Sequence, residues 1–127
     1  MDPTPLQGRW YARAEDAQAD VELYLDVNEE LLFRAIHYRR GGGRYKSQQV
    51  VLTIERLEAS DGGWEIDLSV ARCIEDGRDL TGSHEGKLVR GRGRREPRHL
   101  LLCLPEPGEP RPGDLSSAYR FEKRSGA

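Results

Sequence analysis

Two stretches of the chain alternate strictly between apolar and polar residues. Residues 21–28 (VELYLDVN) carry apolar side chains at the odd positions up to Val27, and residues 64–70 (WEIDLSV) carry them at every even position. A period of two places successive side chains on opposite faces of an extended backbone, whereas a helix needs apolar residues three or four positions apart. Each stretch therefore predicts a β-strand with one buried face and one face in solvent.

Weaker alternation predicts further strands near residues 8–14, 31–38, 48–57, 84–90, 98–104 and 117–124. Turn-forming residues, many of them glycines, separate these segments. A helical turn is an alternative for residues 28–36, because Leu32 and Ile36 would share a helical face. The aromatic continuation of this segment favours a strand.

About eight short strands with tight connections predict an all-β, antiparallel up-and-down meander. Its first and last strands would expose unpaired backbone groups unless they pair with each other, so we expect closure into a small β-barrel. Eight strands enclose an interior that is either packed or holds one small ligand. The expected core residues are Leu6, Trp10, Val21, Leu23, Leu25, Leu32, Ile36, Leu52, Ile54, Trp64, Ile66, Leu68, Leu88, Leu100, Leu102, Tyr119 and Phe121.

Length and charge narrow the functional classes. The 127 residues fit a single domain with its core at about residues 6–124. Twenty basic and 22 acidic residues leave a formal net charge of −2, so no overall positive field attracts nucleic acid or an anionic membrane. The 127 residues show neither a secretion signal nor a membrane-spanning apolar stretch, and a chain whose signal had been removed would look the same. We therefore expect a cytoplasmic monomer or homodimer in which Cys73 and Cys103 are free thiols.

Arginine and glycine concentrate at two predicted turns, residues 39–44 and 90–98. Such segments contact phosphates in RNA-binding proteins, so RNA binding is an alternative. However, no aromatic residues are interleaved for base stacking, and solvated hairpin tips have the same composition. In a meander the two turns would also fall at opposite ends of the barrel, which makes nucleic acid the less favoured partner. The surface candidates for binding a partner protein are Arg39, Arg40, Arg44, Arg92, Arg94 and Arg95.

The three histidines, His37, His84 and His99, fall on three different predicted strands. No pair has the HxH or HxxxH spacing of a preformed metal site, and neither cysteine belongs to a CxxC motif, so we expect no metal and no cofactor. Sequence motifs of hydrolases and phosphate-binding loops are also missing. An isomerase or hydrolase with a histidine base inside the barrel remains an alternative, and His84 with His99 is the pair that neighbouring strands would bring together.

Residues 102–117 (LCLPEPGEPRPGDLSS) are rich in proline and glycine. Pro107 and Pro110 have PxxP spacing, but Arg111 follows them directly, one position earlier than the basic residue of a usual SH3 ligand. Prolines lower the conformational entropy of a long connection and cannot extend either flanking strand. Residues 105–116 are therefore predicted to be a stiff loop inside the domain that joins the last two strands.

The start LQGRW at residues 6–10 and the terminal pattern at residues 102–124 resemble a lipocalin-like domain family that is abundant in planctomycetes and related bacteria. That family has an LQGxW start, a PGxPRPxxFSS loop and a last strand that ends in a basic residue. The resemblance implies a bacterial lipocalin-like β-barrel of uncharacterised role without a catalytic motif. It also implies that Trp10 closes one end of the barrel beneath Arg120 or Arg124. Leu115 departs from the family's aromatic in the loop, so a shared ligand does not follow.

These observations predict a non-catalytic binding module. It would bind a small apolar or amphipathic molecule inside the barrel, or a partner protein encoded nearby through its rim. The interior candidates for ligand binding are Leu23, Tyr24, Leu25, Trp64 and Phe121.

Overall fold

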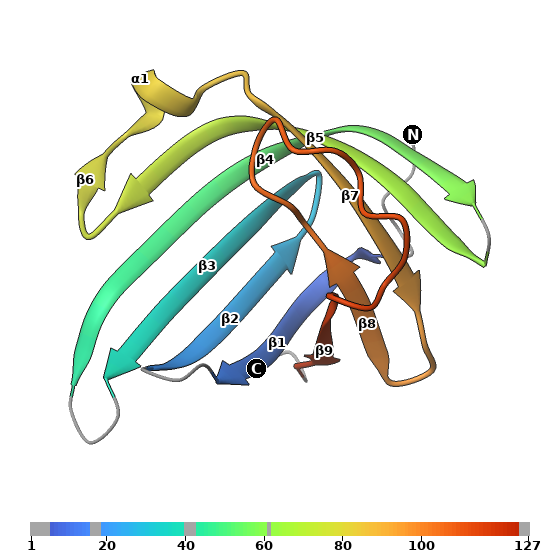
Figure 1. Ribbon diagram of the computed structural model, residues 1–127, viewed down its shortest axis with the longest axis horizontal. Helices are drawn as coiled ribbons and strands as arrows, with labels where there is room; N and C mark the ends of the chain where they lie inside the picture. Colours follow the sequence, from blue (N-terminus) through green and yellow to red (C-terminus); the bar gives the residue numbers. More distant parts are fainter. Residues whose placement is uncertain (1–5, 16–18, 40–42, 61, 125–127) are drawn as a thin grey trace.

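The computed structural model describes residues 6–15, 19–39, 43–60 and 62–124, which form one antiparallel sheet of nine strands (Figure 1). A short helix, α1 (Thr81–His84), interrupts the order of strands. The strands are β1 (Gly8–Glu15), β2 (Ala19–Val27), β3 (Glu30–Arg39), β4 (Arg44–Ser60), β5 (Gly63–Glu75), β6 (Arg78–Asp79), β7 (Leu88–Arg95), β8 (His99–Cys103) and β9 (Tyr119–Lys123).

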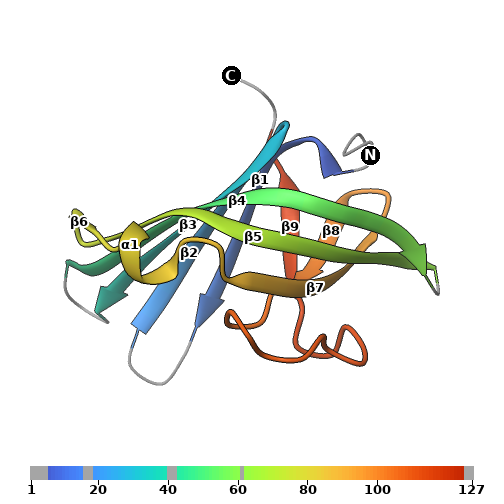
Figure 2. The same ribbon diagram turned by 90° about the horizontal axis from the view of Figure 1, so that it is seen from above.

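Eight of the strands in the described part of the chain close into a barrel. Each of β1 to β4 pairs with the next strand, β5 pairs with β7, and β7, β8 and β9 follow in order. Pairing of β9 with β1, at Trp10 opposite Lys123, completes the ring. The two-residue β6 only extends the edge at the end of β5 (Figure 2). The predicted up-and-down, lipocalin-like barrel is thus confirmed.

The sixth predicted strand, near residues 84–90, is displaced in the structure. His84 ends the helix α1, and β7 runs from Leu88 to Arg95. This strand alternates between outward arginines and inward glycines, so it lacks the apolar pattern by which strands are found. Glycine is required here, because a Cβ on Gly91 would lie 2.6 Å from Cδ2 of Leu104 and 2.9 Å from the carbonyl oxygen of Cys103.

The core follows the predicted alternation with a change of phase on β3. Leu31 and Ala35 are buried, whereas Leu32 and Ile36 are only half-buried, so the core prediction for the latter two was wrong. Because two leucines are adjacent in the sequence, either set of alternate residues on β3 could face the core. Ala35 pairs with Leu23 of β2, so the set that contains Ala35 faces inward. Leu88 and Tyr119, also expected in the core, are 46% and 47% exposed. The helical alternative for residues 28–36 is excluded by β3.

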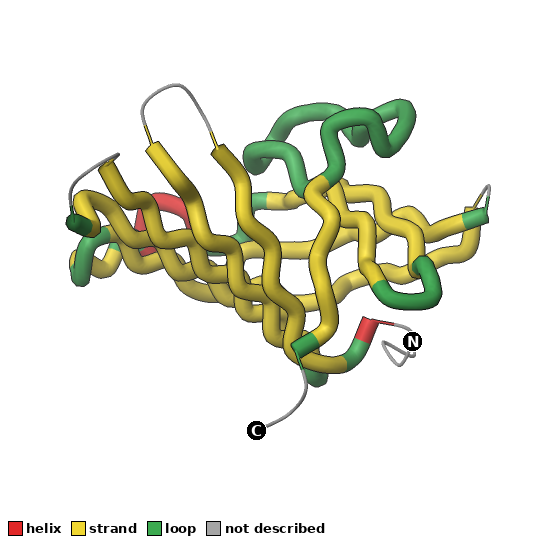
Figure 3. The backbone as a smooth tube through the Cα atoms, turned by 90° about the horizontal axis from the view of Figure 1, so that it is seen from below, coloured by secondary structure: helices red, strands yellow, loops and turns green. Residues whose placement is uncertain are grey.

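The proline-rich loop between β8 and β9, residues 104–118, is hereafter called the strap. It leaves the end of β8 and is the long green loop that stands out beside the strands in Figure 3. Arg92 of β7 donates a hydrogen bond from Nε to the carbonyl oxygen of Pro112 at 2.9 Å, and Arg111 pairs with Glu65 and Asp67 of β5. These contacts fix the strap to the barrel wall.

Candidate functional site

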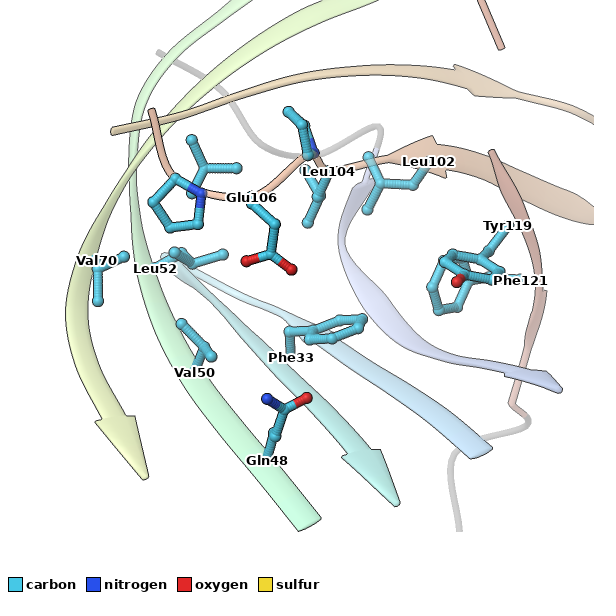
Figure 4. Close-up of a pocket in the computed structure, with 13 residues that line it drawn as sticks. Phe33, Gln48, Val50, Leu52, Val70, Leu102, Leu104, Glu106, Tyr119 and Phe121 are labelled. Carbon is cyan, nitrogen blue, oxygen red and sulfur yellow. The ribbon is translucent and has the colours of Figure 1, made fainter. Parts of the chain in front are cut away.

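A cavity of about 180 Å³ opens at one end of the barrel. The start of the strap borders it on one side and the inward faces of β3, β4 and β5 on the other (Figure 4). Most of the lining is apolar, which is the usual character of a small-molecule site. The lining residues are Phe33, Gln48, Val50, Leu52, Val70, Val89, Leu102, Leu104, Pro105, Glu106, Pro107, Tyr119 and Phe121.

Polar side-chain groups reach this cavity from two directions. Glu106 comes from the strap, and its carboxylate is directed toward Phe33 and Gln48 (Figure 4). Gln48 comes from β4 and brings an amide that both donates and accepts hydrogen bonds. The backbone amide of Gly108 donates to the carbonyl oxygen of Leu88 at 3.0 Å, which holds the strap in place two residues after Glu106.

Asp67 anchors the middle of the strap through charge. Burial alone would raise the pKa of its carboxyl, but hydrogen bonds from Arg56 and Arg111 outweigh burial and hold the pKa below its usual value. The Arg111 side chain is 15% exposed and also lies 3.4 Å from the Glu65 carboxylate. A partly desolvated cluster of ion pairs on the outer face of β5 therefore holds the strap in place.

The structure separates the five predicted interior residues. Leu23, Leu25 and Phe121 are buried in the core, and of these Phe121 lines the cavity. Trp64 packs against the core at the start of β5, paired with Gly93, and does not line the cavity. Tyr24 lies outside the barrel, so its interior assignment was wrong. Its place between Leu23 and Leu25 already puts it on the opposite face of β2.

Tyr24 belongs to a cluster on the outer faces of β1 to β3. Its ring lies 5.3 Å from that of Tyr11, and both hydroxyls donate hydrogen bonds to Glu22, at 3.2 and 2.9 Å respectively. Hydrogen bonds from Tyr38 and Tyr11 hold the pKa of the Glu22 carboxyl below its usual value. The guanidinium of Arg124 lies 5.5 Å from the Tyr24 ring centroid. This cluster stabilises the outer wall and does not contribute to the cavity.

The opposite end of the barrel is closed by Trp10. Its side chain is 1% exposed, and its indole Nε1 donates to the carbonyl oxygen of Leu6 at 2.9 Å. The cations above the ring belong to Arg95 and Lys123, at 4.8 and 5.6 Å from the centroid. The expected closure by tryptophan is therefore present, but the expected cations were wrong.

Neither Arg120 nor Arg124 supplies that cation. Arg120 lies 3.8 Å from Glu96, and Arg124 contacts the tyrosine rings on the outer wall. On β9, the buried Phe121 fixes which residues point inward, and Lys123 shares its parity. Arg120 and Arg124 have the opposite parity and face outward.

The arginine candidates for partner binding do not form one surface. Arg92 is bound to the strap, Arg94 lies 3.5 Å from Glu96, and Arg95 covers Trp10 while donating to the carbonyl oxygens of Glu96 and His99. The second predicted arginine-rich turn is thus mostly strand β7, and Arg92 and Arg95 are structural. In the first turn, Arg39 is exposed at the end of β3 and Arg44 begins β4, whereas Arg40 lies outside the described residues.

The histidines are not brought together. His84 lies in α1 instead of on a strand beside β8, so the expected pairing with His99 was wrong. His99 is on the outer face of β8, 4.0 Å from Glu122. His37 shares the inward parity of Phe33 and Ala35 near the rim. Among the described residues, no group of three or more His, Cys, Asp or Glu side chains could hold a metal ion.

Sequence reasoning missed most of the cavity. Phe33 and Val50 were assigned to strands without an inward role, and Glu106 was part of the loop without a function. Phe33 could have been found from the alternation of β3 once its phase was known. Glu106 carries no periodic signal, because the strap has no repeating geometry and its path depends on the anchors at Arg111 and Pro112.

Comparison of the chain with family models, curated proteins and solved structures finds no match. Within the described residues, no helix is long and apolar enough to cross a membrane. Both cysteines are free thiols: Cys73 is half-buried, and Cys103 is buried beneath the strap with its Sγ 3.2 Å from Oγ of Ser117.

Proposed function

We propose that this barrel is a non-catalytic binding module that holds a small apolar or amphipathic molecule in the cavity at its open end. The observation that carries the proposal is the unfilled, mainly apolar cavity of about 180 Å³, in a barrel whose other end is closed by a buried tryptophan. An apolar cavity at the mouth of a β-barrel, with a few polar groups on its lining, is a usual setting for a small-molecule site.

The volume limits the ligand. An apolar cavity of about 150 Å³ holds a benzene molecule, whereas sites for drug-sized ligands measure roughly 300–1,000 Å³. A single ring with a short substituent therefore fits, and a long-chain lipid does not. The β-barrel fold is compatible with a binding role, and the two free thiols suit the reducing cytoplasm.

Toluene is a suitable first probe, because it has the size of the cavity and no charge. We expect toluene to shift the NMR signals of Val50, Leu52 and Phe121 in a saturable manner. Native mass spectrometry of the protein from its own host should also show a bound small molecule. A Val50→Trp variant fills the cavity and should abolish the toluene effect.

The matched control is Val51→Trp, which places the same side chain one position along β4. Val51 borders a groove with Asp26 and Leu32 on the outer face instead of the cavity. This variant should bind toluene as the parent protein does. Urea unfolding of both variants confirms that they are folded. Absence of any saturable toluene effect in the parent protein, together with absence of a bound host molecule, would refute the proposal.

A further inference from the structure

The lining of the cavity carries a single negative charge. Glu106 is the only charged side chain among the described residues that line it. Its carboxylate faces Gln48 and the aromatic side chain of Phe33 across the opening (Figure 4). Phe121 and Tyr119 add two further aromatic side chains to the lining.

Nearby cations are engaged elsewhere. Lys46, two positions before Gln48 on β4, lies 3.4 Å from the Glu75 carboxylate. Arg111 of the strap turns to Glu65 and Asp67 on β5, and Arg92 is bound to Pro112. Within the described part of the chain, Glu106 forms no ion pair. Its negative charge is therefore available to a molecule that enters the cavity.

A carboxylate at the mouth of an apolar cavity discriminates by charge. It attracts a cationic group, with which it forms a charge-assisted hydrogen bond, and it repels an anionic group of the same size. Aromatic faces around the opening add attraction for a cation, because the ring quadrupole is negative on its face. Gln48 provides a second hydrogen-bond acceptor through its amide oxygen.

We infer that the ligand of this cavity is a small amine: an apolar body about the size of one ring that carries a single protonated amino group, recognised by Glu106 and Gln48. This inference rests on the proposed function and deepens it, since it assigns a chemical class to the bound molecule. The same charge disfavours carboxylate-bearing molecules of the same size.

Three compounds with one ring and a short polar tail test the charge preference. They are 2-phenylethylamine, its neutral isostere 2-phenylethanol, and phenylacetate. In calorimetric or NMR titrations at low salt, we expect the amine to bind about 5- to 20-fold more tightly than the alcohol, the range between an exposed ion pair and a charge-assisted hydrogen bond. Phenylacetate should bind more weakly than the alcohol. Raising the salt concentration should reduce the preference for the amine only.

A Glu106→Gln variant should bring the amine and the alcohol to the same affinity within about twofold, and the affinity for the alcohol should not change. The matched control is Glu109→Gln, which removes an exposed carboxylate from the same strap outside the cavity lining and should keep the full preference. Because both side chains are exposed, both variants should fold.

The outcomes separate the two proposals. Equal binding of amine and alcohol by the parent protein, tighter binding of phenylacetate, or a preference that survives Glu106→Gln would each overturn the amine inference while leaving the cavity as a binding site. Failure of all three compounds and of toluene to bind, together with absence of a bound host molecule, would overturn the binding function itself.

Discussion

The two ends of the barrel are built from the same alternating strands but have opposite characters. At the closed end, Trp10 fills the space between strands, its indole nitrogen is satisfied by Leu6, and Arg95 and Lys123 cover its ring. At the open end, Phe33 leaves room beside it, and the strap reaches over the opening from outside the sheet. The closed end is a packed core, whereas the open end depends on a loop that is held by polar anchors.

The closed end therefore contributes mainly to stability, and the open end contributes mainly to binding. A buried ring that excludes water contributes free energy of folding, while an open cavity gives up part of that contribution. Substitutions at the closed end should therefore change stability most, and those at the open end should change binding or loop opening.

The largest expected effect is that of Trp10→Ala. Removing a fully buried aromatic side chain from a core costs about 3–5 kcal/mol, and here the ring also loses its cation contacts. Urea unfolding followed by circular dichroism measures the change in free energy. The comparison is Phe33→Ala at the open end, which should cost less than half as much because this half-buried ring already borders the cavity. Equal losses would show that the two ends contribute alike.

The second largest loss of stability is expected for Arg111→Ala, which releases the strap. This change removes the cation that joins the strap to Glu65 and Asp67, and hydrogen bonds to charged groups contribute about 1.5–3 kcal/mol. Urea unfolding should show a loss in that range. The control Arg98→Ala removes an exposed arginine from the turn between β7 and β8 and should cost less than about 0.5 kcal/mol. Similar stabilities of the two variants would mean that the strap is not held by this cluster.

The ion pair between Asp67 and Arg111 predicts that the free energy of unfolding depends on pH. The pKa of Asp67 is lower in the folded protein than its ordinary value of about 3.9. The carboxylate therefore adds to the free energy of unfolding above that value, and this stabilisation is lost as pH falls through the folded pKa. The difference in unfolding free energy between the parent protein and Asp67→Asn should therefore shrink between pH 6 and pH 3. A part-exposed ion pair suggests a change of a few tenths to about 1 kcal/mol. A constant difference across this range would contradict the assigned anchor.

The smallest effect concerns thiol reactivity under the strap. Cys103 is buried there, and burial, followed by the charges of Glu75 and Asp79, raises the pKa of Cys73, so both thiols should react slowly with a disulfide reagent. In Arg111→Ala, labelling of Cys103 should accelerate several-fold, because opening of the strap becomes easier. Labelling of Cys73, which the strap does not cover, serves as the internal control, and peptide mass spectrometry distinguishes the two sites. An unchanged Cys103 rate would show that the strap opens independently of Arg111.

The sequence predictions were correct where the strands alternate regularly between apolar and polar residues. Strands such as β2 and β5 were located because every second side chain is apolar, and barrel closure followed from the need to pair the first and last strands. The assignment failed for β7, where glycines take the inward positions, and for the phase of β3, where two adjacent leucines fit either face. In both cases pairing with neighbouring strands supplies the missing information.

The sequence by itself determined the all-β class and the number of strands in the barrel. These features depend on local periodicity and on pairing rules that hold for any chain. Only the tertiary structure decided that Arg95 and Lys123 cover Trp10, that Tyr24 faces outward beside Tyr11, and that Glu106 reaches the cavity. The physical reason is that side-chain contacts between distant strands, and the path of an irregular loop, are set by the three-dimensional packing of the whole barrel and leave no periodic trace in the chain.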